Sequence, residues 1–344
     1  MNGQACLLYS NCIPVRGAKK SIICDLQRSS YIYVPNDLYK ILTEHKGKSV
    51  TEIKSAYQNK YDDIIDSYFR LLLDNEFAFM TDTPELFPPL SMEWDEPFGI
   101  TNAIIDVSDS SFYDIGAAIT QLSDINCKFI QIRFYSRTLV EELRAVLEFF
   151  EQIRSNTIGI EVVIPYCDSF DAEGGTALFN DYPRLYSLLV TSSPFGKMIT
   201  EVGPSRYYIH TAVQIASEAC CGVISKSLFS INIKTFTEAL KFNSCLNRKI
   251  AIDKYGEIKN CPSIAVSYGN IANVTLQSVL ADVEFRKLWT VTKDQVNICS
   301  DCEFRYICTD CRAFTQNADT QYNKPLKCNY DPYAGEWKTI NNRA

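Results

Sequence analysis

Strand-like and helix-like patterns of hydrophobic residues fill the first 82 residues of the chain. The predicted strands are 5–9, 21–26, Ser30–Val34 and 77–80. The predicted helices begin at Asp37 and Ser49 and span Asp62–Asp74. Ser49 and Glu52 have the spacing of a capping box, in which each side chain satisfies a backbone N–H at the start of the helix. Strands, three helices and a closing strand predict a winged-helix module over residues 1–82.

Apolar strands alternate with amphipathic helices farther along the chain. Residues 83–97, rich in Pro, Asp and Glu, are predicted to be a linker. Beyond it, strands are predicted at 100–107, Phe129–Phe134, 158–165, 207–212 and 223–233, and helices at 112–122, 139–153 and 182–190. Strands that alternate with helices of this length form βαβ units around a parallel sheet. We therefore assign residues 98–240 to an α/β region.

Composition and charge narrow the classes of function. The net charge is −7, whereas a nucleic-acid-binding protein needs a basic face for the phosphates. No apolar run approaches the ~20 residues that span a bilayer, and the first residues lack the pattern of a signal peptide. We therefore expect a cytoplasmic protein with no nucleic-acid or membrane partner.

Cysteine is the residue type that points to chemistry. The chain has 14 cysteines, and disulfides are rare in a reducing compartment, so clustered cysteines there indicate metal binding. Half of them lie near the C-terminus: Cys245, Cys261, Cys299, Cys302, Cys308, Cys311 and Cys328. Soft thiolates select zinc or iron–sulfur clusters. Gly256 fits a tight turn between two strands that bring Cys245 and Cys261 together. The two histidines, His45 and His210, are expected to have ordinary surface or core roles.

This order of seven cysteines, with Gly256 between the first two, resembles the SPASM domain of radical SAM peptide maturases. The resemblance covers about Cys245 to Cys328, within a predicted domain of residues 241–344. It has one departure: the family places three residues between the last two cysteines of the four-cysteine run, and this chain has two, Thr309 and Asp310. The resemblance implies two [4Fe–4S] clusters. One would be bound by Cys299, Cys302, Cys308 and Cys328, and the other by Cys245, Cys261 and Cys311.

The fourth ligand of the second cluster, and the metal itself, stay open on the sequence alone. Cys220 and Cys221 are candidate donors, although their favoured interpretation is as buried apolar cysteines. Zinc is the alternative metal, because Cys299, Cys302, Cys308 and Cys311 could form one closed site of four thiolates. That arrangement leaves three cysteines without a role. The third interpretation is that all of these are free cysteines.

The motif that binds the catalytic cluster of radical SAM enzymes is missing. The family places CxxxCxxC after the first barrel strand, and this chain has SDSSFYD there, at residues 108–114. The GGEP-like turn expected after the second strand is FYSRT, at residues 134–138. The resemblance therefore implies a degenerate, partial (β/α) radical-SAM-like barrel. We expect no cleavage of S-adenosylmethionine.

The order of the parts resembles the SPASM-domain peptide maturases of grasp-with-SPASM systems. The segments NCIPVRGAKKSIICDLQR, at 11–28, and CSDCEFRYICTDCRAF, at 299–314, carry this resemblance. Such systems make ribosomally synthesised, modified peptides of the graspetide type, and they encode a precursor peptide and an ATP-grasp ligase. Both are therefore expected partners.

The N-terminal module resembles the precursor-recognition domain of such pathways, in which a leader peptide adds as a strand to a sheet edge and lies against the third helix. The resemblance places the edge at Tyr31, Ile32, Tyr33 and Val34, and the helix face at Tyr61, Ile65, Tyr68 and Leu72. The alternative is that the helix residues are only core.

The sequence and the resemblance together predict three possible functions. The first is an accessory protein that binds the leader and presents the core peptide to the ligase, with two [4Fe–4S] clusters. The alternatives are an iron–sulfur enzyme that modifies the precursor, and a zinc-stabilised structural protein of an interaction complex.

Overall fold

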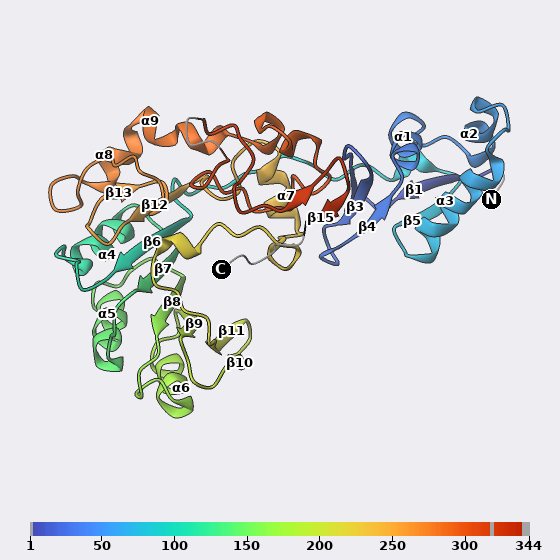
Figure 1. Ribbon diagram of the computed structural model, residues 1–344. Helices are drawn as coiled ribbons and strands as arrows, with labels where there is room; N and C mark the ends of the chain where they lie inside the picture. The colour runs from blue at the N-terminus through green and yellow to red at the C-terminus, as the bar shows by residue number, and fades with distance from the viewer. Residues whose placement is uncertain (1–2, 317–319, 339–344) are drawn as a thin grey trace.

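Two small antiparallel sheets and three helices form the N-terminal part of the protein (Figure 1). The computed structural model describes residues 3–316 and 320–338. The first sheet has the order β2 (Cys12–Val15), β3 (Ser21–Asp25) and β4 (Ser30–Val34), and the second pairs β1 (Ala5–Leu8) with β5 (Ala78–Thr81). The predicted strands of this part are confirmed, and β2 is an addition to them.

The three N-terminal helices are α1 (Asn36–Glu44), α2 (Val50–Ala56) and α3 (Asp62–Asp74), with α3 as predicted. The Ser49 side chain accepts a hydrogen bond from the Glu52 backbone N–H, and the Ser49 N–H donates to the Glu52 carboxylate at 2.8 Å, so the predicted capping box is present. Buried residues at helical spacing, Ile65, Phe69 and Leu72, fix α3 to the core that it shares with β3 and α1.

The first sheet is covered on both faces. Ile23 faces the helices, whereas Ile22 and Cys24 belong to a second core that includes Phe304 and Ile307 of the cysteine-rich C-terminal part. Alternate residues of a strand point to opposite faces, so β3 contributes to both cores. The N-terminal module therefore shares a core with residues more than 200 positions away in the chain.

A mixed sheet of eight strands forms the larger part of the protein, as the predicted α/β class requires. Its order is β10 (Met198–Gly203), β11 (Arg206–His210), β9 (Leu185–Thr191), β8 (Gly159–Pro165), β7 (Phe129–Phe134), β6 (Asn102–Val107), β12 (Lys249–Ile252) and β13 (Ile258–Lys259). The six strands from β11 to β12 are parallel, and the two edge strands are antiparallel to their neighbours. The predicted linker precedes this sheet and contains one short turn, η1 (Pro84–Leu86).

Three helices cover one side of the large sheet: α4 (Ile115–Asp124), α5 (Val140–Gln152) and α6 (Ala172–Asp181) (Figure 1). Leu122 and Phe150 pack on Ile105 and Ile132 in this core. Polar side chains occupy the other face, where the Gln131 amide donates to the Glu161 carboxylate at 2.9 Å. The parallel strands thus carry a helix-covered apolar face and a polar face.

Two predicted elements were wrong. Residues predicted as the helix 182–190 form β9, because a short apolar run does not distinguish a buried strand from a buried helix. Residues predicted as the strand 223–233 form a 3₁₀ turn, η3 (Lys226–Leu228), within an irregular segment. Ile224 and Phe229 of this segment pack into the core beside Phe304, which explains their apolar character. Helix α6 was not predicted.

The C-terminal part contains little regular structure. Its elements are α7 (Ile233–Ala239), α8 (Leu276–Ala281), α9 (Val283–Arg286), β14 (Tyr330–Asp331) and β15 (Glu336–Trp337), with short 3₁₀ turns between them. Gly256 lies at φ +82° in the turn between β12 and β13, as the sequence predicted. None of the described helices is long and apolar enough to cross a membrane.

Candidate metal centres and peptide groove

Electrostatic effects of the C-terminal cysteines on one another's pKa connect them in two groups. The first group is Cys299, Cys302, Cys308 and Cys328. Burial raises the pKa of Cys308 to about 11, the Lys293 ammonium opposes the rise, and the Cys328 and Cys299 thiolates add to it. Burial likewise raises the pKa of Cys302 well above the usual value, with Cys308 and Cys299 contributing. Four thiols that act on one another in a buried environment form a candidate metal site, here named site one.

The second group is Cys245, Cys261, Cys311 and Cys221, here named site two. Burial raises the pKa of Cys261 to about 12, and the neighbouring Cys245 and Cys221 add to the rise. Cys245 and Cys221 also raise the pKa of Cys311, after the larger effect of burial. A Cβ atom at Gly222 would lie 2.9 Å from the Cys311 sulfur, so the backbone beside Cys221 closely approaches that ligand.

Cys221, one of the two candidate donors named from the sequence, raises the pKa of both Cys261 and Cys311. Cys220 and Cys221 are exposed, which corrects their favoured interpretation as buried apolar cysteines. They end a short turn, η2 (Glu218–Cys220), that the Lys327 ammonium holds through the Cys221 carbonyl at 2.6 Å. Sequence spacing could not identify Cys221 as a member of site two, because none of its partners is near it in the chain.

The cysteine sulfurs of the two groups are the ligand type that soft metals prefer, although their side chains do not have the geometry of a metal site. Within the described residues, no three His, Cys, Asp or Glu side chains have metal-binding geometry. Each group nevertheless offers four thiols, the donor type that zinc and iron–sulfur clusters select. The buried carboxylates of Glu303 and Asp310 lie near the thiols of site one. Cys245 and Cys221 raise the pKa of Cys311, whereas Cys328 and Cys299 raise the pKa of Cys308.

A buried ion pair, Asp106–Arg133, lies just before loop 108–114, which lacks the CxxxCxxC motif. Asp106 of β6 accepts two hydrogen bonds from the Arg133 guanidinium of β7, at 2.6 and 2.8 Å, and a third from the Tyr135 hydroxyl at 3.2 Å. Both charged side chains are less than a tenth exposed. The loop 108–114 is anchored by its Tyr113 hydroxyl, which donates to the Asp106 carbonyl at 2.7 Å. The carboxyl ends of the first two parallel strands therefore carry a closed ionic pair instead of cysteine ligands.

The predicted edge strand is an edge in the structure. β4 pairs with β3 on one side, and across the described residues no strand pairs with its other side. The opposite edge of this sheet, β2, contains Pro14, which lacks the N–H that an added strand would use. Tyr31 and Tyr33 of β4 pack on Phe304, at ring separations of 5.5 and 6.0 Å. The free edge thus lies beside the cysteine-rich part.

A groove of about 320 Å³ lies between α1 and the first half of α3. Tyr61, Ile65 and Tyr68 line it, as the resemblance implied for a peptide-binding face, together with Ile64 and Asp37, which the sequence did not single out. Tyr61 is 53% exposed and Ile64 is 48% exposed. Leu72 is fully buried in the core, so it supports the groove from within and offers no surface to a peptide.

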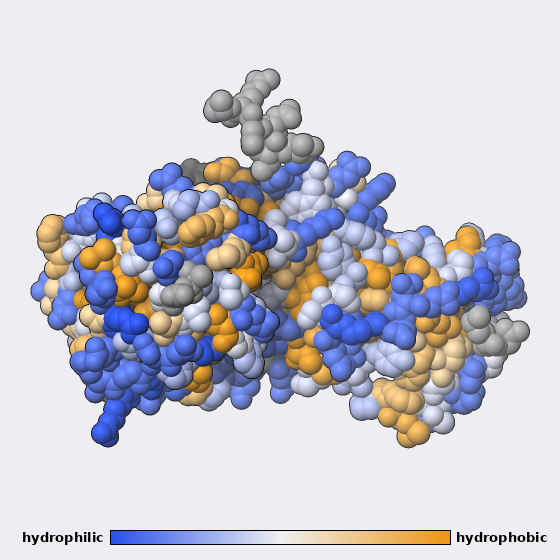
Figure 2. All heavy atoms as spheres, turned by 90° about the horizontal axis from the view of Figure 1, so that it is seen from below, coloured by the Kyte–Doolittle hydropathy of each residue, from blue (hydrophilic) through white to orange (hydrophobic). Residues whose placement is uncertain are grey.

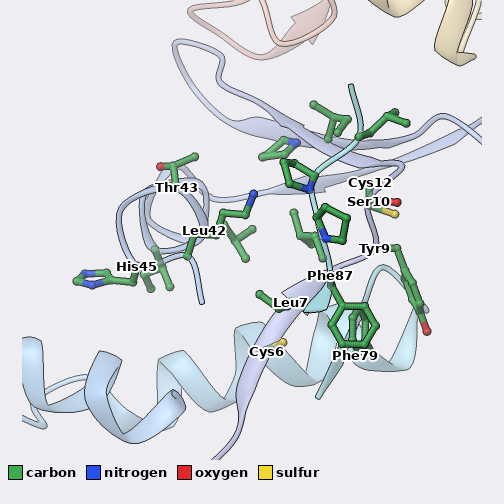
Figure 3. Close-up of a pocket in the computed structure, with 18 of the residues that line it drawn as sticks. Cys6, Leu7, Tyr9, Ser10, Cys12, Leu42, Thr43, His45, Phe79 and Phe87 are labelled. Carbon is green, nitrogen blue, oxygen red and sulfur yellow. The ribbon is translucent and has the colours of Figure 1, made fainter. Parts of the chain in front are cut away.

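A larger, mainly apolar cavity of about 730 Å³ lies in the same module. Figure 3 shows Leu7 and Tyr9 at the β1 end, Phe79 of β5 and Phe87 of the linker gathered on one side of it, while His45 points away. The Phe79 ring stacks edge-on against Phe87, with ring centroids 4.7 Å apart. Hydrophobic residues also reach the surface in patches over this module (Figure 2). The sequence did not predict this cavity, which three distant segments build.

Comparisons with known proteins give only distant likenesses. No protein-family model and no curated protein matches the chain. Among solved structures, SuiB of Streptococcus suis bound to S-adenosylmethionine is similar at 12% identity and a TM-score of 0.36, over 90% of this chain and 96% of SuiB. SuiB bound to its precursor peptide SuiA is similar at 9% identity and a TM-score of 0.28, over 90% and 96%. SuiB alone gives 11% identity and a TM-score of 0.27, over 89% and 96%. TM-scores below 0.5 do not establish a shared fold.

Proposed function

We propose that this protein binds the leader of a ribosomal precursor peptide and presents the core peptide to an ATP-grasp ligase. The observation that carries the proposal is the unpaired edge of β4, which continues through Pro35 into the helix that lines the groove containing Tyr61. An extended peptide that adds to a sheet edge gains backbone hydrogen bonds, and a neighbouring groove selects its side chains. The N-terminal module supplies both elements in one place.

The proposed leader site on β4 adjoins the cysteine-rich part. Tyr33 of β4 contacts Phe304, which lies between two cysteines of site one in sequence, and Lys20 lies 3.9 Å from the Tyr33 ring centroid. A peptide strand on β4 would therefore run beside site one. This placement supports a role in which the cysteine-rich part holds the recognition sheet in position for a partner enzyme.

We propose that each cysteine group binds a [4Fe–4S] cluster, with Cys221 as the fourth ligand of site two. Such clusters supply electron transfer when bound, and four thiolates leave no iron free for a substrate. This complete ligation favours the accessory role over an iron–sulfur enzyme that binds its substrate at site two. The Asp106–Arg133 pair at the degenerate cluster position supports the absence of S-adenosylmethionine chemistry.

Replacing Tyr61 by alanine tests the leader site. The variant is expected to bind a fluorescent leader peptide at least about tenfold more weakly, because an exposed aromatic residue in a binding groove is a typical hot spot. Tyr9→Ala is the matched control: Tyr9 is 43% exposed in the same module but lies outside this groove. Titration by fluorescence anisotropy measures both dissociation constants. Equal affinities for wild type and Tyr61→Ala would contradict the assignment.

Replacing Cys221 by serine tests the fourth ligand of site two. Iron in anaerobically purified protein is expected to fall from about eight to about four per chain, or one cluster is expected to lose its four-thiolate spectrum. Cys220→Ser, the neighbouring exposed cysteine, is expected to keep the wild-type iron content. Iron and sulfide analysis with electron paramagnetic resonance distinguishes them. If both variants behave as wild type, Cys221 is not a ligand.

A further inference from the structure

A lysine ammonium lies near a cysteine sulfur in each candidate site, and Lys293, in site one, is buried. In site one, the Lys293 ammonium lies 3.4 Å from the Cys308 sulfur, and Lys293 is 5% exposed. In site two, the Lys249 ammonium lies 3.7 Å from the Cys245 sulfur, with Lys249 partly buried at the start of β12. A buried ammonium group is costly unless a negative charge compensates it.

The charges around Lys293 leave one positive charge facing site one. Asp310, the residue in the shortened spacing before Cys311, lies 3.6 Å from the Lys293 ammonium. The same carboxylate lies 2.7 Å from the Arg312 guanidinium and accepts a hydrogen bond from the Asn243 amide at 2.8 Å. Two cations and one anion therefore meet here, and no other carboxylate of the described chain is paired with either cation.

The same network reaches the ligands of both sites. The Asn243 carbonyl oxygen accepts the backbone N–H of Cys245 at 3.0 Å, while its amide donates to Asp310. Arg312 donates to the carbonyls of Gln321 and Asn323 at 2.7 and 2.9 Å, which fixes the segment before Cys328.

We propose that Lys293 and Lys249 are the built-in counter-ions of two anionic clusters, Lys293 for site one and Lys249 for site two. This inference rests on the proposed cluster ligation. A four-thiolate cluster gains negative charge when it is reduced, and a nearby fixed ammonium stabilises the reduced state more than the oxidised state. Each lysine therefore raises the reduction potential of its own cluster and helps the site to retain metal.

Two lysine-to-methionine variants test the assignment, each serving as the control for the other. Lys293→Met is expected to shift the potential of one cluster to a more negative value and leave the second unchanged, and Lys249→Met is expected to shift the other. Lys287→Met, which removes an exposed lysine paired with Glu284, is expected to shift neither. The readout is a redox titration followed by electron paramagnetic resonance, with iron measured on each sample. Full iron content with both potentials unmoved in Lys293→Met would overturn the proposal.

Two further results would test the counter-ion role separately from the identity of the bound metal: loss of a cluster in Lys293→Met, and a wild type that contains zinc. If Lys293→Met loses its cluster, Lys293→Arg should restore the iron content, because it keeps the charge; failure to restore it would overturn the proposal. If the wild type contains zinc and no iron, the cluster proposal fails. The lysine role is then tested by zinc release to a chelator, which should be faster for Lys293→Met than for Lys287→Met. Equal release rates would reject the counter-ion role.

Discussion

Cys308→Ala is expected to lose about four of about eight irons and to unfold at a much lower temperature than the wild type. Cys308 is a proposed ligand of site one, and its side chain also packs in the core that contains Phe304 and Ile22. A structural metal site contributes its binding free energy to folding, so its loss costs several kcal/mol. Because Ile22 belongs to β3, the loss is expected to loosen the N-terminal sheet as well.

Thermal unfolding and iron analysis measure this effect. Cys127→Ala is the matched control, since Cys127 is fully buried in the core of the large sheet and belongs to neither cysteine site. It is expected to keep all of its iron and to lose about 1 kcal/mol, the typical cost of a point mutation. A Cys308→Ala protein that retains eight irons would remove Cys308 from the ligand set.

Asp106→Ala is expected to lower the free energy of unfolding by about 3–5 kcal/mol. The substitution leaves the Arg133 guanidinium buried with no carboxylate partner, and an uncompensated buried charge is strongly destabilising. The double variant Asp106→Leu with Arg133→Met is expected to recover most of the loss, because it removes both charges together. Denaturant unfolding monitored by circular dichroism gives the free energies.

The control for this prediction is Asp181→Ala, which breaks an exposed ion pair with Arg144 in the same part of the protein. Exposed pairs contribute about 0–1 kcal/mol, so a small change is expected. If Asp106→Ala and Asp181→Ala cost the same, the pair between β6 and β7 does not stabilise the sheet, and its surroundings are more open to water than its burial indicates.

Elements with a long, regular period were predictable from the sequence. Helix α3 and strand β7 have the predicted bounds, because a helix of 13 residues shows its period of 3.6 and β7 alternates apolar and polar residues, FIQIRF. The strand β9 was mistaken for a helix because its apolar run, LYSLLVT, has no clear period. These residues form a strand because they pair with β8 and β11, and such pairing cannot be inferred from the local sequence.

The candidate sites were predictable where one motif carried them. The four-cysteine run and the edge strand β4 are local, and both were found. Cys220 and Cys221 were named as candidate donors, but the sequence could not choose between them and favoured buried apolar cysteines. The shared core of β3 and Phe304 was not predicted, because its members are distant in the chain. The residues of the predicted peptide-binding face also differ in exposure. Tyr61 is exposed in the groove, whereas Leu72 is buried in the core, and the sequence alone could not separate the two.

The central claim is that the two cysteine groups bind iron–sulfur clusters that hold a peptide-recognition module in place. Iron, sulfide and zinc per chain, measured on protein purified without oxygen, test this claim most directly. The expected result is about eight irons with matching sulfide and little zinc, together with an absorbance spectrum typical of thiolate-bound clusters. Stoichiometric zinc without iron would contradict the claim and leave the cysteine-rich part as a zinc scaffold.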